Sequence, residues 1–300
     1  MKVDEVVVIG YGSVAKSDLT GSVSTVKMSE IADAPVSSVD QALQGRVAGA
    51  DIMSTTGEPG ASTSIRIRGT RSITASNEPL IVVDGVMDGV SDLGDINPAD
   101  IKSISVLKDA SSTAIYGARG ANGVIIVTTK GGSDTGAKPR VTFKADVGFS
   151  QLPRKLDVMN ATEFASYRND IYYIRYFDSG YPNRPESGYQ YTNPEEWGAG
   201  TDWQNVITRT GVYQNYNLSI AGGTKKYNYF ASFGYHNNEG IVINSGLERY
   251  TGRVNASYEL FKWLRLGINV SYEHRNNDNN KVAIGGVNYW NGAIFLLQTG

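Results

Sequence analysis

The sequence predicts an α+β domain over residues 20–132, followed over residues 133–300 by antiparallel β-strands. Three observations support this prediction. Before Gly132 the only aromatic residues are Tyr11 and Tyr116, whereas the other 16 of the 18 tyrosines and every Phe and Trp come later. The first part has short apolar runs and helix-capping residues, whereas the second has segments of about ten residues that alternate with period two. A polar, glycine-rich linker, residues 130–136, separates the two parts.

The composition excludes several classes of function. The 300 residues are 40% hydrophobic and 19% charged, which is enough for one or two domains with hydrophobic cores, and the net charge of −2 does not favour nucleic-acid binding. Cysteine is absent, and with only His236 and His274 a histidine-rich metal site is not expected. No nucleophile-elbow motif marks a catalytic residue. We therefore expect no enzyme activity, no metal and no cofactor.

Local signals define the elements of the first part. Ser37–Gln44 begins with capping hydroxyls and stops before Gly45, which predicts a helix. Asp109 is expected to cap a second helix, which Gly117 ends. The expected strands are Val47–Met53, Ser64–Arg68 and Leu80–Val83, the last of which stops at Asp84 and Gly85.

The second part repeatedly places apolar residues on one face of a strand and polar residues on the other. The apolar faces are Val141, Phe143, Ala145, Val147 and Phe149; Tyr216, Leu218 and Ile220; Tyr227, Tyr229, Ala231, Phe233 and Tyr235; Tyr250, Val254, Ala256, Tyr258 and Leu260; and Leu264, Leu266, Ile268, Val270 and Tyr272. The opposite faces include Arg253, Asn255, Asn269 and Ser271, which we expect to face the aqueous interior if the strands belong to a barrel. This pattern is typical of a transmembrane β-barrel, and a soluble β-sandwich is the alternative. Tyrosines at the ends of the apolar faces favour the barrel.

A long insertion, about residues 157–202, interrupts these strands. Its segment from Asn160 to Arg168 opens like a capped helix, with Glu163 three residues after Asn160. An insertion of this length usually indicates either a functional loop or disorder.

The N-terminus carries a motif that mimics a dinucleotide-binding fingerprint. An apolar run, Val6–Ile9, precedes Gly10, Gly12 and Ala15 in the pattern GxGxxA. The fingerprint needs a helix to follow, so that a pyrophosphate meets the helix N-terminus, but Ser17–Val26 is β-like and interrupted by glycine. A nucleotide site is therefore the weaker interpretation. A short β-branched run of this kind can instead add as a strand to an exposed sheet edge.

The run from Asn97 to Lys130, NPADIKSISVLKDASSTAIYGARGANGVIIVTTK, closely resembles the plug domain of the SusC/RagA-like TonB-linked outer-membrane transporters. The resemblance spans about residues 4–132 and extends more loosely to Gly300. It implies an α+β plug domain followed by antiparallel transmembrane β-barrel strands, of which only part of a barrel of roughly 22 strands is present. It also implies a location in the outer membrane of a Gram-negative bacterium. The start of the chain, Met1–Glu5, lacks a signal peptide, so we expect the chain to be a fragment.

The resemblance also implies roles for particular residues. Residues 1–19 would form the TonB-box segment and its linker, and the box itself comprises Asp4, Glu5, Val6, Val7, Val8, Ile9, Gly10, Tyr11 and Gly12. Its alternative is an ordinary first strand of the plug. Arg66, Arg68 and Arg119 would pair with carboxylates on the barrel wall, and solvated surface arginines are the alternative.

The function that the resemblance implies is the import of oligosaccharides or peptides, with the plug gating the barrel. The expected partners are TonB, a SusD-like surface lipoprotein, the ligand and outer-membrane lipid, and no nucleic acid. Two alternatives remain open, namely a soluble β-rich binding or adhesion module and a nucleotide-dependent enzyme. Neither the substrate nor the residues that bind it can be read from the sequence.

Overall fold

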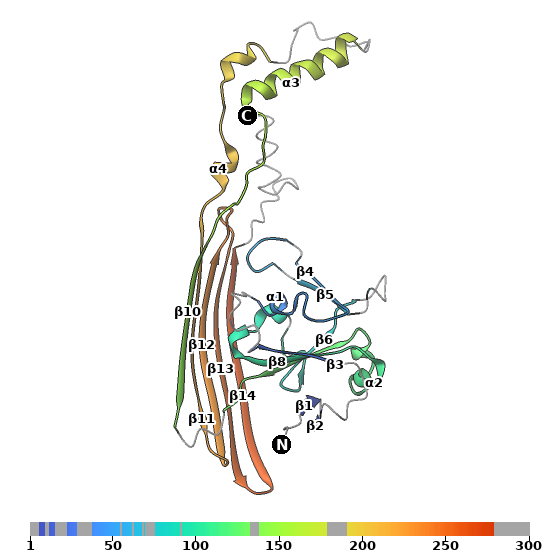
Figure 1. Ribbon diagram of the computed structural model, residues 1–300, viewed down its shortest axis with the longest axis vertical. Helices are drawn as coiled ribbons and strands as arrows, with labels where there is room; N and C mark the ends of the chain where they lie inside the picture. Colours follow the sequence, from blue (N-terminus) through green and yellow to red (C-terminus); the bar gives the residue numbers. More distant parts are fainter. Residues whose placement is uncertain are drawn as a thin grey trace. The chain divides into compact units, whose positions relative to one another are not determined.

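The computed structural model describes residues 6–9, 12–15, 23–28, 38–54, 56–61, 63–67, 69, 76–90, 92–132, 138–178 and 191–278 (Figure 1). The chain divides into two compact units. The first comprises residues 1–148, 213–238 and 246–277, and the second comprises residues 149–212, 239–245 and 278–300. No helix in the described part of the chain has both the length and the apolar character needed to cross a membrane.

The N-terminal domain is built on a five-stranded mixed sheet. Its strands are β3 (Val23–Lys27), β8 (Ile101–Leu107), β9 (Val124–Thr129), β6 (Leu80–Val83) and β7 (Val86–Met87), in the spatial order β3-β8-β9-β6-β7. Only the β6–β9 pair is parallel, and the others are antiparallel. Residues 124–127 of β9 are all apolar, and they are buried by hydrophobic clusters on both faces of the strand. Val83 ends β6 before Asp84 and Gly85, as the sequence predicts.

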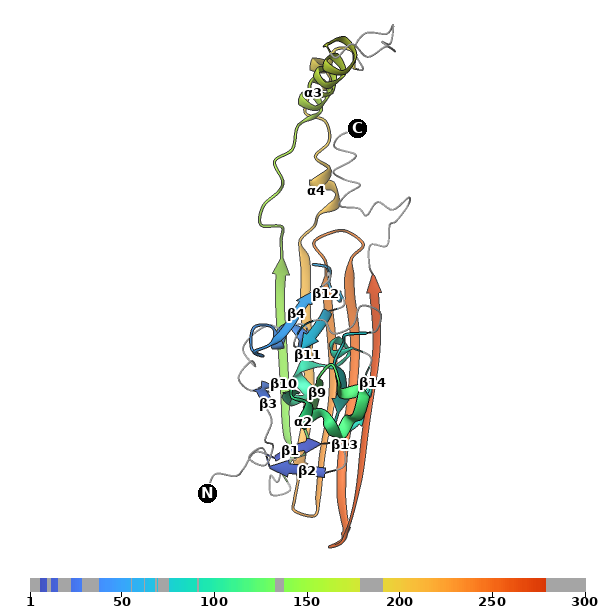
Figure 2. The same cartoon turned by 90° about the vertical axis from the view of Figure 1, so that its right-hand side faces the viewer.

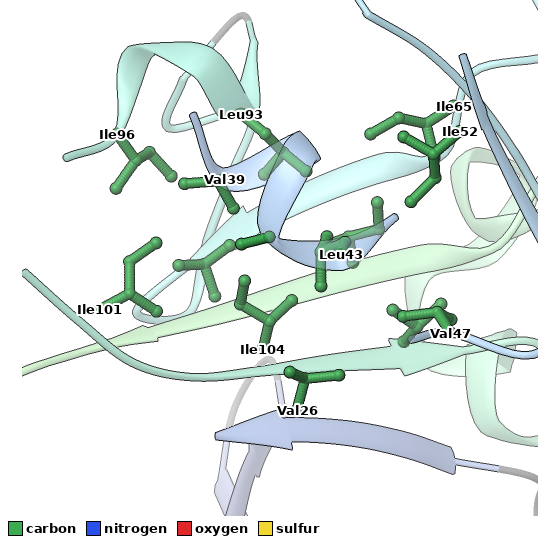
Figure 3. Close-up of a cluster of buried hydrophobic side chains, with 14 of the residues drawn as sticks. Val26, Val39, Leu43, Val47, Ile52, Ile65, Leu93, Ile96, Ile101 and Ile104 are labelled. Carbon is green, nitrogen blue, oxygen red and sulfur yellow. The ribbon is translucent and has the colours of Figure 1, made fainter. Parts of the chain in front are cut away.

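Helix α1 (Val39–Leu43) covers one face of this sheet. Ser38 caps it by accepting a hydrogen bond from the Gln41 amide, and Gly45 follows with a positive φ of 72°. Figure 3 shows Val39 and Leu43 among Leu93, Ile101 and Ile104, all of which are completely or almost completely buried. The predicted start and stop of this helix are confirmed.

Two other predicted elements differ in their bounds. The hairpin of β4 (Ala50–Ser54) and β5 (Thr63–Ile67) begins three residues later than the sequence suggested, because Val47 belongs to a turn in which its carbonyl accepts the Ala50 amide. The side chain of Asp109, the N-cap residue of helix α2 (Ala110–Thr113), accepts no hydrogen bond from the backbone amides of the helix, and so that part of the prediction is wrong. Gly117 does not end the helix but kinks the following 3₁₀ segment η5 (Ala114–Gly120), with φ 60° and ψ −145°.

Five long strands form a second, antiparallel sheet. They are β10 (Arg140–Ser150), β11 (Gly211–Gly223), β12 (Tyr227–Glu239), β13 (Gly246–Phe261) and β14 (Leu264–Asp278), and they lie side by side in chain order (Figure 2). The predicted fold class, an α+β domain followed by antiparallel strands, is confirmed. The predicted alternation also holds, because the large apolar residues of the period-two segments, such as Phe143, Phe233 and Ile268, are exposed on one face.

The second compact unit contains most of the connection between β10 and β11. Helix α3 (Ala161–Tyr173) begins with a capping box, in which Asn160 and Glu163 each bond the other's backbone amide. Its other described elements are a π-helical turn η6 (Ile174–Asp178), a 3₁₀ turn η7 (Pro194–Trp197) and helix α4 (Trp203–Ile207). Tyr191 packs edge-on against both Phe164 and Trp197.

Candidate functional site: the interface between the N-terminal domain and the β10–β14 sheet

A row of polar residues on β13 is buried against the N-terminal domain. Arg249, Thr251, Arg253 and Asn255 are only 3%, 7%, 8% and 8% exposed, respectively. The intervening Val254 is 47% exposed. Because successive residues of a strand point to opposite faces, β13 presents a polar face to the N-terminal domain and an apolar face to the outside.

Asp84 lies at the centre of this interface. It occupies the turn between β6 and β7 with a left-handed φ of 49°, a conformation that Asp tolerates better than most residues. Its carboxylate accepts hydrogen bonds from the Thr129 amide at 2.9 Å, from the Thr129 hydroxyl at 2.6 Å and from Arg253 Nη1 at 3.1 Å. The side chains of Arg253 and Asp84 are 9% and 17% exposed, so this ion pair is largely shielded from water.

Asn255 extends the same network to the end of β9. Its Nδ2 donates to the Thr129 hydroxyl at 3.0 Å and to the Lys130 carbonyl at 2.8 Å. Asp84, Thr129, Lys130, Arg253 and Asn255 therefore form one connected polar cluster, which we call the Asp84 latch. It joins two strands of the N-terminal domain to one strand of the second sheet.

Asn97 makes a second, separate connection. Its Nδ2 donates to Asn217 Oδ1 on β11 at 2.9 Å and to the Thr251 hydroxyl on β13 at 3.1 Å, while its Oδ1 accepts the Ala99 amide. A side chain at Gly234, on β12 between them, would collide with Asn97 Nδ2. Glycine at this position therefore allows the N-terminal domain to approach the sheet closely.

Strand β14 holds the N-terminal domain at a third place. Arg275 donates to Asp95 Oδ1 at 3.1 Å and to the Gly60 carbonyl at 2.6 Å, and Asn277 donates to the same carbonyl at 3.2 Å. On β13, Arg249 donates through Nη1 to the Gly94 carbonyl. Both arginines thus reach the 3₁₀ turn η3 (Leu93–Asp95).

Two buried carboxyls of the N-terminal domain lie close to these contacts. Burial raises the pKa of Asp40 to about 6, and the neighbouring Asp92 carboxylate raises it as well. Burial also raises the pKa of Asp100 above its ordinary value, although Ser232, Arg253 and Lys130 favour its ionised form. Arginines of the sheet thus contribute to keeping these acids ionised, Arg253 at Asp100 and Arg275 at Asp40, beside the hydrogen bonds from Ser232 and Thr63.

Of the three arginines chosen from the sequence, neither Arg66 nor Arg119 forms this interface. Arg119 pairs with Asp88, a residue of the N-terminal domain, and not with a carboxylate of the second sheet. Arg66 is exposed and lies opposite Asp51 in the β4–β5 hairpin, while Arg68 lies outside the described residues. The charges across the interface are distributed in the opposite way to the expected one. The sheet supplies the arginines, and the N-terminal domain supplies the carboxylates. The polar row on β13 was visible in the sequence, but its partners were not.

The N-terminal segment forms a strand, not the start of a nucleotide fold. Val6–Ile9 is β1, and it pairs antiparallel with β2 (Gly12–Ala15) in a separate two-stranded sheet, with Val7 opposite Val14. A strand therefore follows the GxG motif where a dinucleotide site would need a helix. Asp4, Glu5, Gly10 and Tyr11 lie outside the described residues. Within the described part of the chain, no group of three or more His, Asp or Glu side chains could hold a metal ion.

Comparisons with known proteins agree with this architecture. Residues 15–124 match the family described as TonB-dependent Receptor Plug Domain. TonB-dependent receptor P26 of Formosa agariphila is 44% identical over 284 residues, which cover 94% of this chain and 28% of that protein. TonB-dependent receptor SusC of Bacteroides thetaiotaomicron is 40% identical over 283 residues, or 91% of this chain and 26% of that protein.

A solved structure, that of the RagAB peptide importer in the open-open state, superposes with a TM-score of 0.77 and 32% identity. The match covers 94% of this chain and 34% of that one. The chain thus spans about a quarter to a third of the length of these relatives.

Proposed function

The chain is a homologue of the SusC-like TonB-dependent receptors, and from this premise we propose that it is the plug and first barrel wall of an outer-membrane transporter. In this proposal the N-terminal domain is the plug, and β10–β14 begin the barrel. The transporter imports oligosaccharides or peptides, and displacement of the plug opens the pore.

The observation that carries this proposal is the two-sided character of β13. The polar row of β13 forms hydrogen bonds with the plug, and the other face of the strand exposes Tyr250, Val254 and Tyr258. A wall that separates a polar plug from hydrocarbon needs this arrangement, because lipid cannot satisfy polar groups. A soluble adhesion module would instead leave a large apolar surface in water, which monomeric soluble proteins rarely do.

The N-terminal segment is proposed to couple the plug to TonB. Val6–Ile9 is a β-branched run that already adopts a strand in β1, so it is preorganised to add to the sheet of a partner. Asp4, Glu5, Gly10, Tyr11 and Gly12 complete the proposed TonB box. We also infer a SusD-like surface lipoprotein as the second partner, as in the resemblance noted above.

Energised uptake by the full-length protein tests this proposal. Val7→Pro removes a main-chain donor from the proposed TonB box and should abolish uptake while leaving ligand binding unchanged. Val14→Pro is the matched control, because it disturbs the opposite strand of the same hairpin without altering residues 4–12. If Val7→Pro transports normally, or if both variants fail equally, the segment does not act as a TonB box.

The same uptake assay separates the two ligand classes. Cells that depend on this transporter are supplied with either an oligosaccharide mixture or a peptide mixture as the limiting nutrient. If growth on one of the two mixtures requires Val7 to be intact, that mixture contains the class of ligand that is transported. Growth that is independent of the protein on both mixtures would contradict the import proposal.

A further inference from the structure

Two neighbouring hairpin turns at one end of the β10–β14 sheet carry exposed lysines. The β11–β12 turn holds Lys225 and Lys226, and the β13–β14 turn holds Lys262. The Glu259 amide, in β13 close to its turn into β14, donates to the Lys226 carbonyl at 2.7 Å, which places the two turns at the same end of the sheet. The three ammonium groups therefore belong to one rim of the sheet.

Aromatic side chains accompany these lysines. Trp263 is 80% exposed and stacks on Phe261, with ring centroids 5.5 Å apart and planes inclined by 9°. Tyr227 follows Lys226 directly and is also exposed. Amphipathic rings of this kind favour the boundary between hydrocarbon and headgroups. Tyr227, which shares the apolar face of β12 with Phe233, continues that face up to the lysines.

The charge of the rim is positive. Glu259 is the acidic residue nearest the lysines along these two hairpins, and Arg265 pairs with it at 3.2 Å. Arg140, at the start of β10, adds a further exposed cation at the same end of the sheet. Among the described residues, no ion pair joins Lys225, Lys226 or Lys262 to a carboxylate, so an anionic group that approaches the two turns meets unpaired lysines.

The lengths of the connections identify which side of the membrane this rim faces. The two lysine turns span residues 224–226 and 262–263, whereas the connection from β10 to β11 at the opposite end spans residues 151–210. Outer-membrane barrels have short turns on the periplasmic side and longer loops outside. The lysine turns therefore face the periplasmic leaflet, an assignment that rests on the outer-membrane location proposed above.

We propose that Lys225, Lys226 and Lys262 bind the phosphates of anionic phospholipid headgroups in the periplasmic leaflet, with Tyr227 at the level of the headgroups. Lysine binds phosphate as a point charge and needs no fixed geometry, which suits mobile side chains on exposed turns.

The test uses the full-length protein in nanodiscs that contain phosphatidylcholine with a minor fraction of phosphatidylglycerol. After extraction, native mass spectrometry measures how much phosphatidylglycerol stays bound relative to phosphatidylcholine. Each lysine near a lipid surface contributes about a fivefold preference for anionic lipid. The triple variant K225Q/K226Q/K262Q should therefore lose the preference by at least about tenfold.

A matched control removes three positive charges from the connection between β10 and β11, in the variant R154Q/K155Q/R175Q, and should keep the preference. The proposal would be overturned if the wild-type protein and both triple variants kept the same preference for phosphatidylglycerol, or if both variants lost it to the same extent. A preference for lipopolysaccharide over phosphatidylglycerol, or full displacement of the lipid by inorganic phosphate, would also overturn it. Failure of the wild-type protein to insert into membranes would instead refute the proposed function itself.

Discussion

Breaking the Asp84 latch should lower the free energy that holds the plug against the sheet, and the geometry of the latch sets limits on the size of this loss. The change Asp84→Asn removes the charge but keeps the shape, and Asn tolerates the left-handed φ of 49° as well as Asp does. It leaves the Arg253 guanidinium, whose side chain is 9% exposed, without its carboxylate. Removing one partner of a buried ion pair costs about 3–5 kcal/mol, and partial access of water reduces this to about 2–3 kcal/mol here.

The reciprocal change, Arg253→Gln, should cost less. Asp84 then retains the amide and hydroxyl of Thr129 as donors, at 2.9 and 2.6 Å. The Asp84 carboxylate keeps these two hydrogen bonds and loses only the charge-assisted bond from Arg253, which is worth about 1.5–2 kcal/mol. The double variant should be less destabilised than the sum of the two single variants, by about 1 kcal/mol or more.

Hydrogen exchange of the β9 amides in the full-length protein measures these free energies of opening. A loss of about 2 kcal/mol corresponds to an exchange rate about thirtyfold faster at the Thr129 amide. Arg265→Gln is the control, since the side chains of Arg265 and Glu259 are 60% and 31% exposed and the pair should contribute less than about 1 kcal/mol. Strictly additive effects of Asp84→Asn and Arg253→Gln would show that the latch does not act as a unit.

Two further predictions concern pH and the faces of the wall. The pKa of Asp40 is about 6 in the fold against 3.8 ordinarily, so the folded plug binds more protons than the unfolded chain between these values. The free energy of unfolding of the plug should therefore fall by up to about 3 kcal/mol as pH rises from 4 to 7. Asp40→Asn should remove this fall. Urea unfolding of residues 20–130 expressed alone measures both. In membranes, water-soluble thiol reagents should label cysteines on the polar face and spare those on the apolar face, whereas uniform labelling would indicate a soluble sheet. The positions are Asn269 and Ser271 on the polar face and Val254, Ala256, Ile268 and Val270 on the apolar face.

Most of the local structure could be predicted from the sequence because its causes are local. Ser38 and Gly45 limit helix α1, and period-two alternation shows which residues of β13 share a face. The buried polar row on β13 was thus predicted as a set, but it was expected to face water. The structure shows instead that Arg253 and Asn255 face the plug.

The partners across the interface could not be predicted in the same way. Asp84 and Arg253 are 169 residues apart, and their meeting depends on how two sheets dock. In the sequence Asp84 reads only as a turn residue that ends a strand. Arg119 looked like an interface residue but pairs within the plug, because η5 places it beside Asp88. Composition carries no information about which side of an interface supplies the cations.

The central claim is that the plug covers the wall at rest and leaves it when TonB pulls on the N-terminal segment. Asn255 is buried against the plug at rest, so a cysteine at this position reports on the plug directly. In cells that produce the full-length Asn255→Cys protein, a water-soluble thiol reagent should label it only when TonB is energised and ligand is present. Adding Val7→Pro should restore protection. Labelling that is equal in resting and energised cells, or that is unaffected by Val7→Pro, would contradict the account.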